Sequence, residues 1–213
     1  MRPPRALTPR ALPGPALIGL TGGIAAGKSE VLRVLSDLGA ETLSTDAVVH
    51  DLLGTDEVRE LLIDRWGERV APGGNLDRGL IAGIVFEEPE ELAWLEALLH
   101  PRVGRRVIEW RRSLPDQLEV AVVEVPLLFE GTMAEMFDAT IAVVAEDGAR
   151  RRRAAARGTG ELEGRSARQL SQEEKADRAT FVVHNDGTLA DLEAELRRLL
   201  PRLTAAADRP DSV

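Results

Sequence analysis

A chain of 213 residues, of which 44% are hydrophobic, is long enough to form one domain around a substantial core. Its formal net charge of −9 argues against broad nucleic-acid binding, and the lack of cysteine excludes disulfides, thiolate zinc sites and a cysteine nucleophile. No apolar run approaches the ~20 residues that span a membrane. We therefore expect a cytoplasmic protein with neither a nucleic-acid nor a membrane partner.

The amino-terminal stretch is rich in proline. Residues 1–15 contain three arginines, five prolines and no acidic residue. A transit peptide is also basic, but it needs an amphipathic helix, which these prolines prevent. We therefore expect a disordered tail or an over-long start site at 1–15, and a second tail at 206–213.

A glycine-rich segment follows. The apolar run at 16–21 predicts a strand, and the apolar spacing over 28–39 predicts a helix. The sequence between them fits G-x-x-x-x-G-K-S in the strand-to-helix context that supports a phosphate-binding loop. The predicted ATP-binding residues of this segment are Gly22, Gly23, Ile24, Ala25, Ala26, Gly27, Lys28, Ser29 and Glu30.

The residue types of this loop suit a triphosphate and Mg²⁺. Glycines allow close approach, successive N–H groups form a concave anion site, and the helix start adds partial positive charge. Lys28 is expected to reach the β- and γ-phosphates, and the Ser29 hydroxyl to bind Mg²⁺. Only two of the 27 basic residues are lysines, and one of them is Lys28. The alternative is a glycine-rich turn that binds nothing.

The rest of the chain alternates between strand and helix patterns. Further strands are predicted at 41–44, 119–125, 139–145 and 180–184. Helices are predicted at 46–53 with Thr45 as N-cap, and at 56–66, 76–86, 89–112, 147–157, 165–178 and 189–203. The alternation predicts an α/β fold, the three-layer αβα arrangement of P-loop NTPases with a mostly parallel five-stranded sheet. Ligands of such sheets bind at the carboxyl ends of the strands.

Phosphate loops of this kind occur in several classes of protein. A GTPase is expected to carry an Asn-Lys-x-Asp motif, which this sequence lacks. ATP-driven machines are usually longer than this chain. Two helical insertions and an arginine-rich helix at 147–157 therefore favour a small-molecule kinase.

Several segments together resemble the dephospho-CoA kinase family. They are the loop segment 19–29, then Gly-Asn-Leu-Asp-Arg at 74–78, Leu-His-Pro-Arg-Val at 99–103, Glu-Val-Pro-Leu-Leu-Phe-Glu at 124–130, the residues Arg153, Arg157, Gln169 and Lys175, and Asn-Asp-Gly at 185–187. The resemblance covers about 16–203 in the order of the family. It implies Mg²⁺-dependent transfer of the ATP γ-phosphoryl group to the ribose 3′-hydroxyl of dephospho-CoA, the last step of coenzyme A synthesis.

The resemblance also implies a three-part architecture. The nucleotide core is expected at 16–50, 117–146 and 179–205, a helical substrate insertion at 51–116, and an arginine-bearing lid at 147–178. Together they form one kinase domain over 16–205, which we expect to be a monomer.

Two positions depart from the pattern of the family. Ser44-Thr45-Asp46 stands where the family usually has Asp-x-Asp, so only the second carboxylate is present. We therefore expect Asp46 to act near the acceptor hydroxyl and to help bind Mg²⁺, with Glu124 as the next candidate. The alternative is a helix-start aspartate favoured by the dipole. Thr180 stands where the family usually has Asp, which we attribute to local packing.

The remaining predicted site residues bind ATP or the acceptor. Arg153, as a catalytic residue, and Arg157 share one helix face at spacing i, i+4, although a solvated basic face is the alternative. Asn185 and Gly187 are expected at the adenine, unless they only form a turn. The predicted acceptor-binding residues are Arg78, through a bidentate phosphate contact, His100 and Glu124, each with a structural role as alternative.

Two other functions are compatible with the loop. One is a P-loop kinase for a nucleoside or nucleotide. The other is an ATP-binding regulator without turnover, which Ser44 would favour if it marks lost activity.

Overall fold

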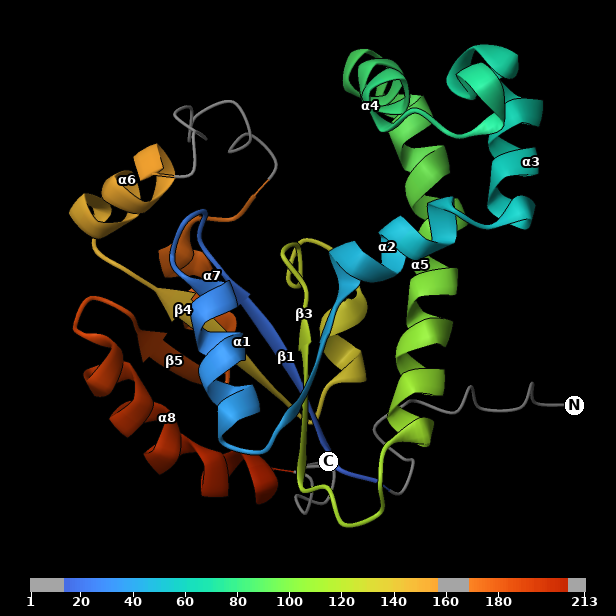
Figure 1. The fold of residues 1–213 in the computed structure, drawn as a ribbon. Coiled ribbons are helices and arrows are strands. Elements are labelled where there is room, and N and C mark those ends of the chain that lie inside the picture. Colours follow the sequence, from blue (N-terminus) through green and yellow to red (C-terminus); the bar gives the residue numbers. More distant parts are fainter. Residues whose placement is uncertain (1–13, 157–168, 207–213) are drawn as a thin grey trace, which may run out of the picture. The chain divides into compact units, whose positions relative to one another are not determined.

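The computed structural model of the chain describes residues 14–156 and 169–206 (Figure 1). Arg157, one of the predicted ATP-binding residues, lies outside the described residues. The chain divides into two compact units, a core unit of Met1–Leu43 and Trp110–Val213 and a helical unit of Ser44–Glu109. The predicted insertion at 51–116 overlaps the helical unit, and its bounds and those of the lid remain predictions.

The core unit is built on a parallel sheet. Within the described part of the chain the strands are β1 (Ala16–Gly22), β2 (Glu41–Ser44), β3 (Val120–Glu124), β4 (Ala139–Val144) and β5 (Phe181–His184), in the order β2-β3-β1-β4-β5. β1 pairs in parallel with β3 and with β4, and β4 pairs in parallel with β5. The predicted α/β fold with a mostly parallel five-stranded sheet is confirmed.

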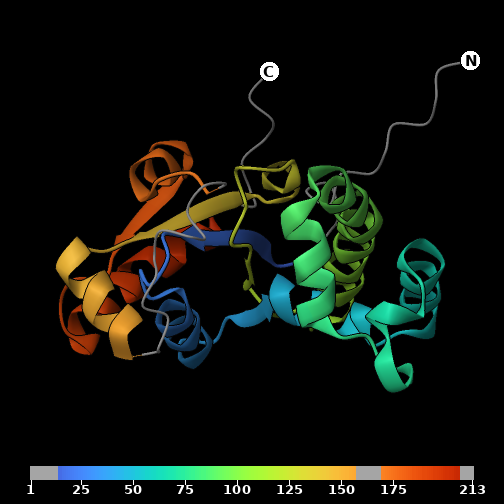
Figure 2. The same cartoon turned by 90° about the horizontal axis from the view of Figure 1, so that it is seen from above.

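Helices cover both faces of this sheet. The helices of the core unit are α1 (Lys28–Asp37), α6 (Asp147–Ala156), α7 (Gln172–Arg178) and α8 (Leu189–Thr204), with a short 3₁₀ turn η4 (Met133–Met136). Figure 2 shows α7 on the opposite side of the sheet from α1 and α8. The core unit therefore has the predicted three layers.

The face of the sheet under α1 and α8 holds the main apolar core. α8 presents leucines at spacing i, i+4, i+7 and i+11, which form one stripe toward the sheet: Leu192, Leu196, Leu199 and Leu203. Burying each such side chain contributes about 1.5–3 kcal/mol. This packing holds β1, and with it the start of the glycine-rich loop, in a fixed place.

Of the helix predicted at 165–178, residues 165–168 lie outside the described residues, and within the described part the helix begins at Gln172. The reason is a capping box. The Ser171 hydroxyl accepts a hydrogen bond from the Glu174 N–H at 3.1 Å, and the Glu174 carboxylate accepts one from the Ser171 N–H at 2.8 Å. These reciprocal bonds satisfy two N–H groups at the helix end, so the first turn starts there.

Thr180, one of the two positions that depart from the family pattern, immediately precedes β5 and contacts Thr140 of β4. The Thr180 N–H donates to the Thr140 hydroxyl at 3.0 Å, and the Thr140 N–H donates to the Thr180 hydroxyl at 3.1 Å. Each threonine thus pairs its side chain with the backbone of the other and joins β4 to the start of β5. That this pairing is a local packing difference from the family remains a prediction.

The helical unit contains α2 (Thr45–Leu53), α3 (Asp56–Trp66), the 3₁₀ turns η2 (Glu68–Val70) and η3 (Pro72–Gly74), α4 (Arg78–Glu87) and most of α5 (Pro89–Ser113). Glu91 ties α5 to α3, because its carboxylate accepts hydrogen bonds from the Arg65 guanidinium and from the Trp66 indole, each at 2.7 Å. The hydrogen bonds from Arg65 and Trp66 lower the pKa of Glu91 below its ordinary value.

Candidate functional site

The glycine-rich loop connects the end of β1 to the start of α1. Gly27 is the N-cap of α1 and adopts φ +100°, a left-handed conformation that favours glycine. A side chain at Gly27 would also overlap the Asn185 amide, and one at Gly22 would overlap the Val143 carbonyl. Glycine is therefore required at both positions by conformation and by space.

The loop ends where a helix offers N–H groups to an anion. The Gly27 carbonyl accepts hydrogen bonds from the Glu30 and Val31 N–H groups at 3.0 and 3.1 Å, which closes the first turn of α1. N–H groups of a first turn point along the axis away from the helix, and the dipole adds partial positive charge. The predicted phosphate site therefore has the backbone geometry that such a site needs.

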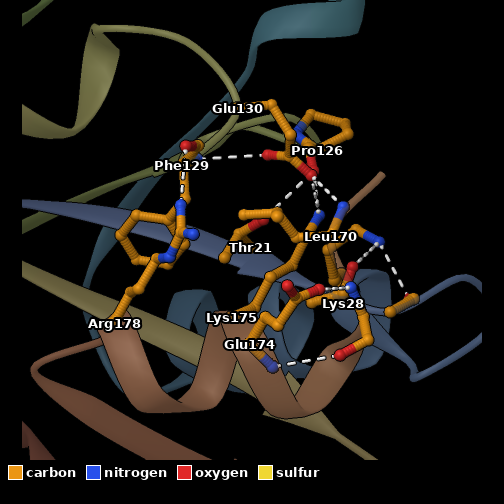
Figure 3. Close-up of polar contacts among 12 residues, drawn as sticks. Thr21, Lys28, Pro126, Phe129, Glu130, Leu170, Glu174, Lys175 and Arg178 are labelled. Carbon is orange, nitrogen blue, oxygen red and sulfur yellow. Dashed lines mark hydrogen bonds and ion pairs between the residues drawn. The ribbon is translucent and has the colours of Figure 1, made fainter. Parts of the chain in front are cut away.

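Lys28 extends back over the loop that precedes it. Its ammonium donates to the Gly22 carbonyl at 3.2 Å and to the Gly23 carbonyl at 3.3 Å, as the dashed lines at Lys28 in Figure 3 show. The side chain is half-buried. A cation held at the mouth of an anion site is placed to pair with a phosphate oxygen.

Donors from two distant elements hold the carbonyl groups of the loop. Arg150 of α6 donates to the Ile24 carbonyl at 3.0 Å, and Arg153 donates to the Ala26 carbonyl at 3.3 Å. The buried Asn185 amide, just after β5, donates to the same Ala26 carbonyl at 3.1 Å. In a planar trans peptide the C=O and N–H point to opposite sides. Fixing these carbonyls therefore fixes the direction of the loop's N–H groups.

The structure brings Arg153 and Asn185 together, because the Arg153 guanidinium also donates to the Asn185 carbonyl at 2.8 Å. Gly187 instead lies against Asp191 at the start of α8. Glu30 is engaged on the outside of α1, where its carboxylate accepts a hydrogen bond from Arg33 at 2.6 Å. Ser29 is exposed in the first turn of α1.

Glu124 ends β3, the strand beside β1. It pairs in register with Leu20, two residues before the loop begins. Its carboxylate therefore belongs to the same carboxyl edge of the sheet as the loop, as the sequence predicts.

The other predicted acceptor and metal residues lie in the helical unit. Asp46 is exposed in the first turn of α2, where Ser44, and not Thr45 as predicted, is the N-cap. Arg78 is exposed as the first residue of α4. His100 is exposed on α5, and its proline neighbour does not end that helix, which runs on to Ser113.

Two polar residues that contact the loop, and a third that contacts the segment after β3, were not among the predicted site residues. Arg150 is on α6. Gln172 accepts a hydrogen bond from the Ala145 N–H at 3.2 Å and lies within 3.3 Å of where a side chain on Gly23 would begin. Lys175 is fully buried on α7. For Arg150 a signal existed, since it lies one helical turn before Arg153. For Gln172 the sequence held no such signal, because its place beside Gly23 depends on the fold.

A strand, a glycine-rich loop and a helix start at the carboxyl edge of a parallel sheet define a P-loop nucleotide-binding protein. A protein-family model described as dephospho-CoA kinase matches residues 16–191 of the chain. The chain belongs to the dephospho-CoA kinase family, which confirms the resemblance seen in the sequence.

Known proteins agree with this assignment. The dephospho-CoA kinase of Protochlamydia amoebophila is 37% identical over 87% of this chain and 95% of its own length. That of Deinococcus radiodurans is 40% identical over 89% of this chain and 93% of its own. A solved structure from Thermus thermophilus has 37% identity and a TM-score of 0.76, covering 89% of this chain and 98% of that one.

None of the described helices has the length and apolar character to cross a membrane.

Proposed function

We propose that the chain transfers the γ-phosphoryl group of ATP to the ribose 3′-hydroxyl of dephospho-CoA and releases coenzyme A and ADP. One observation carries this proposal: a complete phosphate loop, with its carbonyls held by α6 and Asn185, lies in a chain whose residues 16–191 match the dephospho-CoA kinase family.

The proposed reaction is an in-line displacement at phosphorus. The acceptor oxygen bonds to the γ-phosphorus while the bond from that phosphorus to the β–γ bridging oxygen breaks. The hydroxyl proton passes to a carboxylate, and ADP leaves with the bridging oxygen. The loop N–H groups and Lys28 would hold the phosphates and stabilise the charge that shifts toward the leaving oxygen.

Ser29 is suited to hold Mg²⁺, because its hydroxyl is exposed in the first turn of α1 beside the loop. Mg²⁺ usually takes one or two protein oxygens together with substrate phosphates and water. Among the described residues, no three His, Cys, Asp or Glu side chains form a metal-binding group. When bound, Mg²⁺ would neutralise the β- and γ-phosphate oxygens. Asp46 as a second ligand is part of this proposal.

Arg153 is proposed to stabilise the transferring phosphoryl group. A guanidinium has five N–H donors, and contacts to the Ala26 and Asn185 carbonyls account for two of them. Arg153 can therefore keep the loop in place while it offers a further donor to phosphate. Asn185 and Gly187 are proposed at the adenine, and Arg157 as a further ATP contact.

On the acceptor side we propose Asp46 as the carboxylate that receives the hydroxyl proton. Its short side chain is exposed and follows β2 directly. Glu124, Arg78 and His100 are proposed to bind dephospho-CoA, with Arg78 as a bidentate partner of an acceptor phosphate. A monomeric state and a cytoplasmic location are parts of the proposal that rest on sequence alone.

A coupled assay of ADP release tests the proposed function. Purified chain with Mg-ATP is incubated with dephospho-CoA and, in parallel, with adenosine or AMP as the acceptor. We expect ADP release to depend on dephospho-CoA. Release with a nucleoside or nucleotide instead would indicate the alternative kinase. ATP binding without ADP release from any acceptor would indicate the non-catalytic regulator.

A further inference from the structure

Lys175 is one of the two lysines of the chain and, among the described residues, the largest fully buried side chain. A lysine is almost never fully buried unless its charge is paired, because removal of an ammonium from water is costly. The family's reaction, as described above, does not use this residue. Its burial therefore needs an explanation.

The ammonium of Lys175 meets two acceptors in the segment that follows β3. It donates to the Pro126 carbonyl at 2.7 Å and lies 3.0 Å from the Glu130 carboxylate (Figure 3). The same Glu130 carboxylate accepts hydrogen bonds from the Phe129 and Leu170 N–H groups, at 3.2 and 3.0 Å. One buried ion pair thus joins α7 to the segment 125–130.

The segment 125–130 is connected both to the end of β3, which carries Glu124, and to the end of β1, where the loop begins. Pro126 lies two residues after Glu124, and its carbonyl also accepts a hydrogen bond from the Thr21 hydroxyl at 3.1 Å. Thr21 is fully buried and immediately precedes the first glycine of the loop. The Val125 N–H donates to the Leu20 carbonyl at 2.8 Å and continues the pairing of β3 with β1.

Two donors from different elements therefore converge on one carbonyl. Lys175 reaches the Pro126 oxygen from α7, and Thr21 reaches it from β1. A lysine suits this fully buried position, because its small ammonium has three donors on a long side chain. An arginine would bring five donors that need partners. This accounts for a lysine in a chain that otherwise uses arginine for almost every positive charge.

We infer that Lys175 is a positioning residue for phosphoryl transfer. Its buried ammonium holds the Pro126 carbonyl and Glu130, and through them it fixes the end of β1, from which the phosphate loop starts, and the end of β3, which carries Glu124. Lys175 does not touch the nucleotide. This role rests on the proposed function, because positioning is measured as a change in the rate of transfer.

The test compares a single variant with a charge-balanced double variant. Lys175→Met leaves Glu130 buried without its cation and is expected to lower Tm strongly, since breaking a buried pair strands a charge. Lys175→Met/Glu130→Gln removes both charges and keeps an acceptor for one of the Phe129 and Leu170 N–H groups, which bind different oxygens of Glu130. We expect it to regain part of the lost Tm, while kcat at 25 °C stays lower by about tenfold or more, as misplaced catalytic groups cause.

Hydrogen exchange gives a second readout that does not need the acceptor. In the double variant, peptides covering 20–29 and 124–130 are expected to exchange faster than in wild type, while peptides of α8 exchange at the wild-type rate. Arg178→Met is the matched control. Arg178 lies on the same helix and donates to the Phe129 carbonyl at 3.3 Å from an exposed position, so we expect kcat within about twofold of wild type.

A double variant with recovered Tm, wild-type kcat and unchanged loop exchange would overturn the positioning role and leave a structural one. An equal loss of kcat in Arg178→Met would also overturn it. If no Lys175 variant folds, Thr21→Val decides, because it removes the second donor to Pro126 and nearly preserves shape. Wild-type kcat in Thr21→Val would then refute the role. Lack of turnover in wild type would instead refute the proposed function, and loop exchange would still test Lys175.

Discussion

Replacing Gly27 by alanine tests whether the loop depends on the conformation seen at its last glycine. Gly27 has φ +100°, and its missing side chain leaves the space that the Asn185 amide occupies. Gly39 is a matched control, since it has φ +97° and no atom lies within 4 Å of where a side chain would begin. The two substitutions share backbone strain and differ in the collision.

The structure gives the expected magnitudes. Placing a non-glycine residue in a left-handed conformation costs roughly 1–2 kcal/mol, and both variants carry that cost. Gly27→Ala must also displace the Asn185 amide from the Ala26 carbonyl, a 3.1 Å hydrogen bond. The Ala26 carbonyl keeps its hydrogen bond from Arg153, but the buried Asn185 amide loses its acceptor, which costs about 1–3 kcal/mol more. We therefore expect Gly27→Ala to be destabilised by about 1–3 kcal/mol more than Gly39→Ala.

Urea unfolding measures the stability difference, and calorimetric titration with Mg-ATP measures the affinity of the loop for ATP. We expect the Kd for ATP to rise about tenfold or more in Gly27→Ala, equivalent to about 1.4 kcal/mol, and to stay at the wild-type value in Gly39→Ala. Equal stability of the two variants, or wild-type ATP affinity in Gly27→Ala, would refute the idea that Asn185 and Gly27 together shape the loop.

Four further changes test other parts of the site and the fold. Lys28→Ala should lower kcat by a factor on the order of 10² or more, as removal of other electrostatic stabilisers does, and a rate near wild type would contradict its role at the phosphates. Asp46→Asn should abolish transfer while calorimetric ATP affinity stays largely intact; an unchanged rate would move the acid to another carboxylate. Ser44→Asp should preserve or raise the rate, because it restores the family residue; a collapse in rate would mean that the site has adapted to serine. Glu91 has a lowered pKa through Arg65 and Trp66, so its contribution to stability is present above its ordinary pKa and is lost as pH falls through the lowered value. Glu91→Gln should therefore be less stable than wild type at pH 7 and show a weaker loss in acid, as measured by urea unfolding followed by tryptophan fluorescence; parallel pH profiles would contradict this.

The phosphate loop was predictable because its signal is local. Four fixed positions between a strand pattern and a helix pattern were enough to name every residue from Gly22 to Ser29, and the structure has the strand and the helix in those places. The alternation of apolar runs likewise predicted the order of strands and helices, because continuous apolar runs suit buried parallel strands.

The contacts that support the loop were not predictable, because they join residues far apart in the chain. Asn185 reaches the Ala26 carbonyl across 159 positions, and Lys175 reaches Pro126 across 49. No spacing rule covers such pairs. The composition did mark Lys175 as unusual, since it is one of only two lysines, but only its burial shows why a lysine is there.

Helix ends show a smaller difference between the predicted and the observed structure. The predicted helix at 165–178 included residues 169–171, which are not helical in the structure, although Ser171 followed three residues later by Glu174 is a recognisable capping box. That signal was present in the sequence and competed with a continuous polar helix pattern. Thr140 and Thr180, in contrast, form their reciprocal bonds only because the fold brings β4 and β5 side by side.

The most direct measurement is a ³¹P NMR spectrum of the wild-type chain incubated with Mg-ATP and dephospho-CoA. The account predicts a new phosphomonoester signal, from a phosphate on the ribose 3′ oxygen of the acceptor, that grows in equal amount with ADP. Folded protein that leaves the acceptor unphosphorylated, or that releases ADP without this signal, would contradict it.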